Sequence, residues 1–135
     1  MILASSFALI SPAVAQNSGT PSAPIRNLDA QPISQDLLQK FIALAAINGC
    51  MLLQEKIDYK SVLKSGVAAV AGIVYTDYAS KISGINGDKP LENNQLAAGV
   101  GLDLSIQLSG RCEKLIPSDD LKKLEEYLNS TSIKK

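Results

Sequence analysis

Apolar residues recur every three or four positions from residue 34 to residue 55, and this spacing constrains the fold more than any other feature of the chain. The run QDLLQKFIALAAINGCMLLQ follows Ser34, a residue type that commonly caps a helix. Gly49 could end this helix or lie where another helix approaches closely. Because apolar residues continue to Leu53, we predict one helix over about residues 35–55. Its predicted inward residues are Leu37, Leu38, Phe41, Ile42, Ala45 and Ala46.

A second helical pattern follows Asp58 and covers residues 59–82. Gly66 and Gly72, with the alanines between them, give a low-relief surface that favours close helix packing over a cofactor site. Residues 83–94 contain two Gly, one Pro and an Asn-Gly step, so a loop is predicted there. They lack the alternating oxygen ligands of a calcium loop. The predicted inward residues of the second helix are Leu63, Val67, Val70, Val74 and Tyr78.

Residues 95–111 fit two structures. From Val100 to Leu108, large apolar residues alternate strictly with polar residues or glycine, which is typical of a half-buried strand. A helix would instead place Ala97, Gly101, Leu104, Leu108 and Cys112 on one face, with Asp103 and Gln107 toward water. A lone strand needs a partner for its backbone groups, and only residues 73–78 could supply one. We therefore predict a helix.

The last pattern begins at Pro117 and Ser118 and is amphipathic. Asp119 and Asp120 lie at the expected N-terminal end, where the helix dipole favours negative charge. The predicted inward residues are Leu121, Leu124, Tyr127 and Leu128. These patterns predict an all-α domain over residues 34–130, a compact bundle of about four helices, followed by a tail over residues 131–135.

The N-terminus has the pattern of an export signal. An apolar run over residues 1–10 is broken at Ser11 and Pro12, and Ala13-Val14-Ala15 gives the small-x-small pattern that precedes cleavage, here before Gln16. The first basic residue is Arg26, so we expect the true start codon to lie upstream. A buried or anchoring helix is the alternative, but about ten apolar residues are too few to span a bilayer.

Export would place the protein in the periplasm, the thylakoid lumen or the extracellular space, with no stable membrane span after the signal is removed. Residues 16–33 contain three prolines and several small polar residues without an apolar period, which predicts a flexible leader. No Cys lies at the cleavage position, so a lipid anchor is not indicated.

Charge and residue usage exclude several functions. The 13 basic and 13 acidic side chains balance, and the chain has no Trp, two Phe and four Tyr, which argues against a nucleic-acid partner. His is absent from the sequence, so the usual general base and the commonest metal ligand are missing.

Cys50 and Cys112 are the two cysteines of the chain. A zinc site would require four ligands, and a thiol enzyme would use a His base. The thiol enzyme lacks its base because the chain has no His. The zinc site lacks ligands because there is no third Cys and no Asp or Glu lies within four residues of Cys50. In an exported protein an even number of cysteines is expected to pair. We therefore predict a disulfide between them, and no metal or cofactor.

Carboxylates are the remaining candidates for catalysis, because glycosidases need only two of them. Asp77, between Tyr75 and Tyr78 at the end of an apolar run, is the least ordinary acid of the chain. Such a cluster also occurs where a helix end meets water. Residues 119–126 alternate acids with lysines, as solvated helix faces do.

The runs GCMLLQEKIDYKSVLKSG and GRCEKLIPSDDLKKLEEYL give the chain a recognisable layout. A Cys and an apolar helix precede an acid-capped helix, and a second Cys leads into a Pro-containing helix start. This layout, over roughly residues 36–128, resembles small exported proteins of cyanobacteria without an established activity. Some carry automatic names such as cyclic-AMP phosphodiesterase or metallo-beta-lactamase. The absence of His contradicts those names, because metallo-beta-lactamases bind zinc through histidines.

Two functional hypotheses remain. The first is a non-enzymatic helical module that binds another exported protein, a peptide or a small ligand through apolar helix faces, with a chaperone-like role as a variant. The second is a hydrolase that uses carboxylates alone, with Asp77 as its candidate. Attachment to a membrane surface through the last helix is disfavoured, because its polar face mixes acids with lysines. The oligomeric state is not determined by these patterns.

Overall fold

The computed structural model describes residues 26–132. The helices are α1 (Gln35–Gln54), α2 (Tyr59–Tyr78), α3 (Asn93–Cys112) and α4 (Ser118–Ser132), with short 3-10 turns at Asn86–Asp88 and Glu113–Leu115. The only β-type pairing within residues 26–132 is one isolated parallel bridge between Ile33 and Ile82. The all-α prediction is confirmed. The predicted signal peptide, with Ala13, Ala15 and Gln16, lies outside the described residues.

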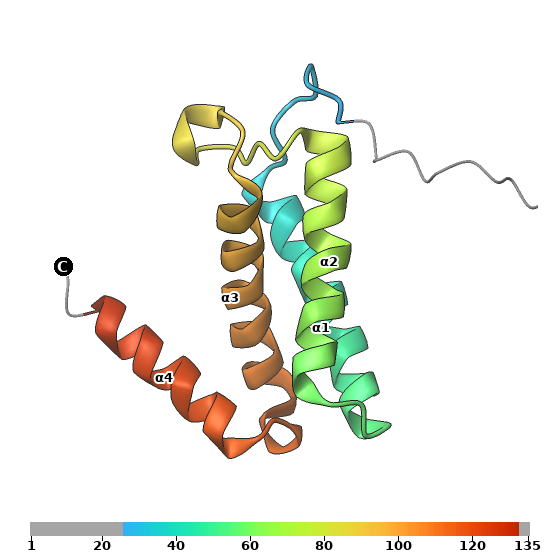
Figure 1. The fold of residues 1–135 in the computed structure, drawn as a ribbon, viewed down its shortest axis with the longest axis vertical. Coiled ribbons are helices and arrows are strands. Elements are labelled where there is room, and N and C mark those ends of the chain that lie inside the picture. Colours follow the sequence, from blue (N-terminus) through green and yellow to red (C-terminus); the bar gives the residue numbers. More distant parts are fainter. Residues whose placement is uncertain (1–25, 133–135) are drawn as a thin grey trace, which may run out of the picture.

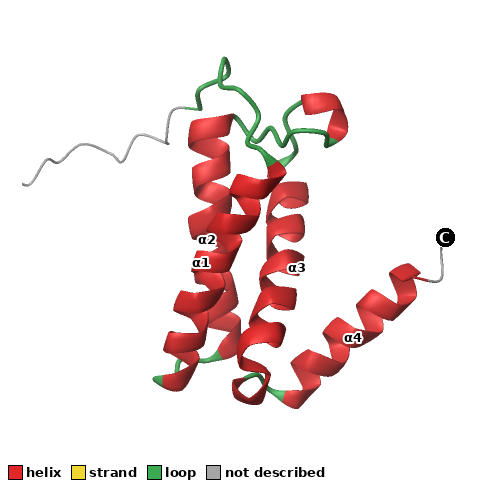
Figure 2. Ribbon diagram, turned by 180° about the vertical axis from the view of Figure 1, so that it is seen from behind, coloured by secondary structure: helices red, strands yellow, loops and turns green. Residues whose placement is uncertain are grey.

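Helices α1, α2 and α3 each pack against the other two and form an up-down-up core (Figures 1 and 2). α1 buries a stripe with steps of three and four residues, from Leu38 to Leu53. Gly49 lies within α1 and does not end it, and Leu108 of α3 packs against it. The apolar residues after Gly49 continue the helix, as predicted. The fully buried side chains at the centre of the core include Ile42, Val74, Leu104 and Leu108.

The ends of the helices follow from local chemistry. The Ser34 hydroxyl accepts a hydrogen bond from the backbone N–H of Leu37, and the Asp58 carboxylate accepts one from that of Ser61. α2 ends at Tyr78 instead of continuing to residue 82, because Ala79 and Ser80 take left-handed backbone angles, with φ of 51° and 59°.

The segment over residues 95–111 is helical, which confirms the choice between helix and strand. α3 begins with a capping box in which Glu92 and Gln95 exchange side-chain and backbone hydrogen bonds. No strand lies beside α3 in the described part of the chain, so a strand there would have had no partner for its backbone groups.

α4 lies apart from this core. It leaves the lower end of α3 and points away from the three packed helices, so the two form a V (Figure 1). Its few contacts are with α3, and none of its side chains is fully buried. Leu121, Leu124 and Leu128 are half-buried, whereas Tyr127, which we expected to face inward, is exposed. The bundle thus has a compact core of three helices and a fourth helix at its edge. α4 extends to Ser132, two residues into the predicted tail.

Residues 26–33, the last part of the predicted leader, are described by the structure. Residues 26–33 run against the end of α2, where the Arg26 guanidinium donates a 2.7 Å hydrogen bond to the carbonyl of Ala79. Ile33 is completely buried, and its backbone bonds to both Lys81 and Ser83. A single apolar residue among polar neighbours carries no periodic signal, which is why the sequence pattern did not reveal this contact.

Candidate functional site

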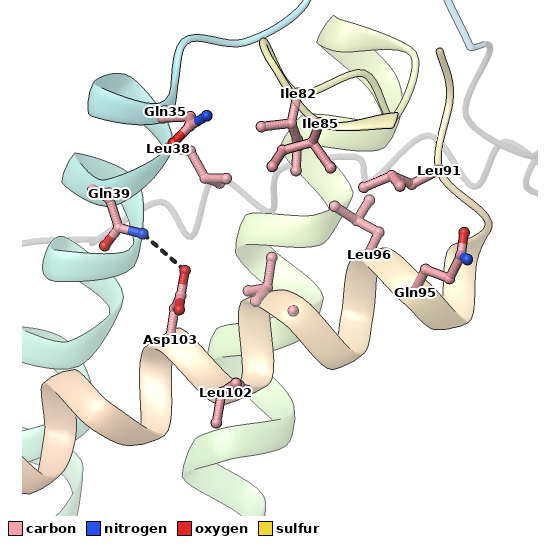
Figure 3. Close-up of a pocket in the computed structure, with 12 residues that line it drawn as sticks. Gln35, Leu38, Gln39, Ile82, Ile85, Leu91, Gln95, Leu96, Leu102 and Asp103 are labelled. Carbon is pink, nitrogen blue, oxygen red and sulfur yellow. Dashed lines mark hydrogen bonds between the residues drawn. The ribbon is translucent and has the colours of Figure 1, made fainter. Parts of the chain in front are cut away.

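A cavity of about 370 Å³ opens at the upper end of the core, between α1, α3 and the loop that joins α2 to α3 (Figure 3). Its wall is mainly apolar and is formed by side chains that point toward one another from these three parts of the chain. The lining residues are Gln35, Leu38, Gln39, Ile82, Ile85, Leu91, Gln95, Leu96, Gly99, Val100, Leu102 and Asp103. A concave apolar space with a few polar groups is the usual form of a small-ligand site.

The loop over residues 79–92 shapes this cavity. Its left-handed start turns the chain away from α2, and the bridge between Ile33 and Ile82 holds Ile82 above α1. The N–H of Leu91 then donates a 2.9 Å hydrogen bond to the carbonyl of Ser80, which fixes the other end of the loop beside its start. The loop is therefore closed on itself, and the apolar side chains of Ile82 and Leu91 form one wall.

Gly99 keeps part of the cavity open from the α3 side. A Cβ atom at this position would meet no atom within 4 Å, so the missing side chain leaves free space. The residue has ordinary helical backbone angles, and a larger side chain there would enter the cavity without backbone strain.

One edge of the cavity is polar. The Gln39 side-chain amide donates a 2.8 Å hydrogen bond to the Asp103 carboxylate, and its carbonyl accepts one of 3.2 Å from Gln107. Gln35 donates to the carbonyl of Ser83 at 2.9 Å. Asp103 is half-buried and is the one ionisable residue of the lining. The edge thus offers hydrogen-bond acceptors and a negative charge beside an apolar wall.

The polar cluster predicted around Asp77 is not assembled into a site. Asp77 is exposed, and its carboxylate accepts a 3.0 Å hydrogen bond from the hydroxyl of its neighbour Thr76. The Arg26 guanidinium lies 5.2 Å from the centre of the Tyr75 ring, a cation–π contact. Tyr78 packs against the edge of the hydrophobic core. These three side chains therefore have separate surroundings.

Cys50 and Cys112 form a disulfide at the opposite end of the core from the cavity, with their Cα atoms 5.9 Å apart. The disulfide joins Cys50, one turn before the end of α1, to the last residue of α3. In the described range, residues 26–132, no three His, Cys, Asp or Glu residues are grouped so that they could hold a metal ion. The cysteine pair is structural in its placement, since it lies among core contacts.

The sequence pattern places Asp103 and Gln107 on the polar side of a helix, but it does not show that Asp103 lines a cavity or that both side chains bond to Gln39. The signal that existed was the spacing of polar residues by four on two helices, Gln35 with Gln39 and Asp103 with Gln107. Both pairs lie on partly buried helices, where two polar residues one turn apart can mark a shared polar edge.

An 18-residue window of α1 has a mean hydropathy of 1.4, so by length and composition α1 is long and apolar enough to cross a membrane. It is the one such helix within residues 26–132. A core helix of a water-soluble protein can meet the same criterion, and α1 packs against both α2 and α3.

The fold and the cavity define an all-α protein with one disulfide and an apolar pocket beside its three-helix core. Residues 36–135 match the family model described as "Domain of unknown function (DUF8650)". The chain belongs to this family. No curated protein and no solved structure matches the chain.

Proposed function

We propose that the protein is an exported, non-enzymatic binding module that takes up a small amphipathic molecule in the cavity between α1, α3 and the loop over residues 79–92. The observation that carries this proposal is the apolar cavity of about 370 Å³ with acceptor groups along one edge. Ligand sites for small molecules range from about 300 to 1,000 Å³. The cavity therefore suits a ligand at the small end of that range.

The charge of the lining selects among such ligands. Asp103 supplies a carboxylate, and no Lys or Arg belongs to the lining of this cavity. A neutral or cationic head group that donates hydrogen bonds is favoured there, whereas an anionic head would be repelled. The proposed ligand class is a molecule with an apolar body and a hydroxyl or ammonium head.

Export is supported by the pattern of residues 1–16 and by the disulfide, because such bonds persist in oxidising compartments. The non-enzymatic role is supported by the absence of His from the sequence and by the separate positions of Asp77, Tyr75 and Tyr78. N-terminal sequencing of protein from an exporting host tests the first point, with Gln16 as the expected first residue. An uncleaved N-terminus would contradict it.

Binding can be tested with two eight-carbon probes of opposite charge, octylammonium and octanoate, each used to displace the neutral dye Nile red. We expect octylammonium to displace the dye at lower concentration than octanoate. Gly99→Leu should fill the cavity and abolish dye binding without loss of helix content. Gly72→Leu is the matched control, since Gly72 also has no atom within 4 Å of a built Cβ but lies on α2, outside this cavity. Equal dye binding by the Gly99→Leu variant and the original protein would refute the proposed site.

A further inference from the structure

α1 carries a second apolar stripe on the side opposite its buried one. Leu44, Ile47 and Met51 are 63%, 47% and 59% exposed, respectively. They follow one another at steps of three and four residues and so lie on one line along the helix. None of the helices of the described chain covers this line, since α2 and α3 pack on the other side and α4 points away (Figure 2).

Opposite charges lie at the two ends of this stripe. Lys40 continues it toward the N-terminus of α1, and Glu55 continues it just beyond the C-terminus. Both side chains are exposed, and the Lys40 ammonium also forms a 2.7 Å ion pair with the Asp36 carboxylate one turn before it on α1. The sequence of the stripe from end to end is therefore basic, apolar and acidic, over a length of about 22 Å at the helical rise of 1.5 Å per residue.

The outer positions of the stripe are symmetric about the point between Ile47 and Asn48. Leu44 lies three residues before Ile47, and Met51 lies three residues after Asn48. Lys40 lies seven residues before Ile47, and Glu55 lies seven residues after Asn48. When two such helices pack antiparallel about a two-fold axis at this centre, Leu44 meets Met51 and each charge meets its opposite. Ile47 alone meets a polar residue, Asn48.

We propose that the α1 stripe is the interface of a homodimer, in which α1 of a second copy packs antiparallel against it. Leu44 of one copy then contacts Met51 of the other, Ile47 lies beside Asn48 across the axis, and Lys40 pairs with Glu55 twice. The two-fold arrangement is the commonest symmetry of protein dimers, and its interface uses the same patch on both copies. Parallel packing would instead place Lys40 beside Lys40 and Glu55 beside Glu55.

This interface is distinct from the cavity. The cavity takes Leu38 and Gln39 from α1, whereas the stripe takes the opposite side of the helix. One crossing of two helices buries less than the roughly 1,600 Å² of a standard interface, so the dimer should exchange with the monomer at about micromolar concentrations. The inference does not depend on the proposed ligand.

Charge reversal tests both the partner and the register. In sedimentation velocity at low salt, Lys40→Glu alone and Glu55→Lys alone should each weaken the dimer by about tenfold, because each change turns two attractive pairs into two repulsive ones. An equimolar mixture of the two variants should form a heterodimer as strong as the original dimer, since every pair is then attractive. The double variant K40E/E55K should also regain self-association.

The control variant K122E/E126K makes the same charge changes on α4, where Lys122 and Glu126 are exposed, and should leave the dimer unchanged. The variant L44Q/M51Q should be monomeric while its circular dichroism stays helical, because both side chains are already exposed. A single monomeric species of the original protein at all concentrations would overturn the proposal. Self-association that ignores the charge reversals, or co-flotation of a monomer with vesicles of neutral phospholipid, would also overturn it.

Discussion

Gly49 of α1 faces Leu108 of α3 so closely that a Cβ built on the glycine would lie 2.9 Å from the Leu108 Cδ2 atom. The same Cβ would lie 3.0 Å from the Val62 Cγ1 atom of α2. Three helices thus meet at one glycine, one residue before the disulfide cysteine. Both neighbouring side chains are buried, which leaves little room for them to move.

Replacement of Gly49 by Ala should therefore destabilise the protein. Overpacking costs roughly 1–3 kcal/mol, and the better helix propensity of Ala returns up to about 1 kcal/mol. We expect a net loss of about 1–2 kcal/mol in the free energy of unfolding, measured by urea denaturation. Gly72→Ala provides the control, because nothing lies within 4 Å of its Cβ position and the change should be stabilising. A stabilised Gly49→Ala variant would show that the helices are less closely packed than described.

The disulfide should contribute a large part of the stability. It closes a loop with a sequence separation of 62 residues, and the chain-entropy estimate for that length is about 4 kcal/mol. The variant C50S/C112S should unfold at correspondingly lower urea concentration, and thiol titration of the unfolded, unreduced protein should find no free thiol. Two titratable thiols per chain would contradict the bond between Cys50 and Cys112.

Asp58 should give α2 an acid-dependent cap. The Ser61 hydroxyl and then the Ser61 backbone N–H hold the pKa of the Asp58 carboxyl below its ordinary value of 3.8. Because the folded-state pKa is the lower one, the stabilisation is complete above the unfolded-state value. It is lost as the pH falls through the folded-state value. Asp58→Ala should lower the Tm at pH 7, and this difference should shrink below about pH 3.8.

Asp58→Asn separates the charge from the cap, because Asn also accepts a hydrogen bond at a helix N-terminus but does not titrate in this range. Thermal unfolding followed by circular dichroism from pH 2 to pH 7 should show a smaller effect of this change than of Asp58→Ala. A difference between Asp58→Ala and the original protein that is independent of pH would rule out the carboxylate as its source.

Replacement of Asp103 should affect ligand binding, whereas replacement of Asp77 should not. Asp103→Asn removes the negative charge at the cavity edge, so it should weaken octylammonium binding and reduce the preference over octanoate. Asp77→Asn changes an exposed carboxylate bonded to Thr76 and should leave binding and stability within about 0.5 kcal/mol of the original. Loss of a hydrolytic activity in the Asp77→Asn variant would instead support the carboxylate hydrolase.

The helices could be predicted because their signals are local. Ser34 and Asp58 cap the helices that follow them, and the spacing of apolar residues continues through Gly49. For α3 the local pattern also fits a strand, and the helix is favoured because a strand there would have no partner for its backbone groups. The placement of α4 could not be predicted in this way. The pattern of Leu121, Leu124 and Leu128 shows which side of the helix is apolar, but the part of the molecule that this side meets depends on the turn over residues 113–117.

The cavity could not be predicted for a similar reason. It depends on the left-handed angles at Ala79 and Ser80 and on the contact between Ile33 and Ile82, which lie 49 positions apart in the sequence. Ile33 belongs to no periodic pattern, and Ile82 ends the helical pattern of residues 59–82 but lies in the loop that follows α2. Sequence propensities describe single helices, whereas this cavity forms where the loop over residues 79–92 packs against α1 and α3.

The bond between Cys50 and Cys112 also makes a covalent ring of the chain that lies between them. The ring contains α2, the loop over residues 79–92 and α3, whereas most of α1 and all of α4 are tails attached at its two closing points. A protease that cuts once in the exposed loop would open the ring without releasing a fragment. The nicked molecule would keep its mass under oxidising conditions, apart from one added water, and would separate into two pieces only after reduction.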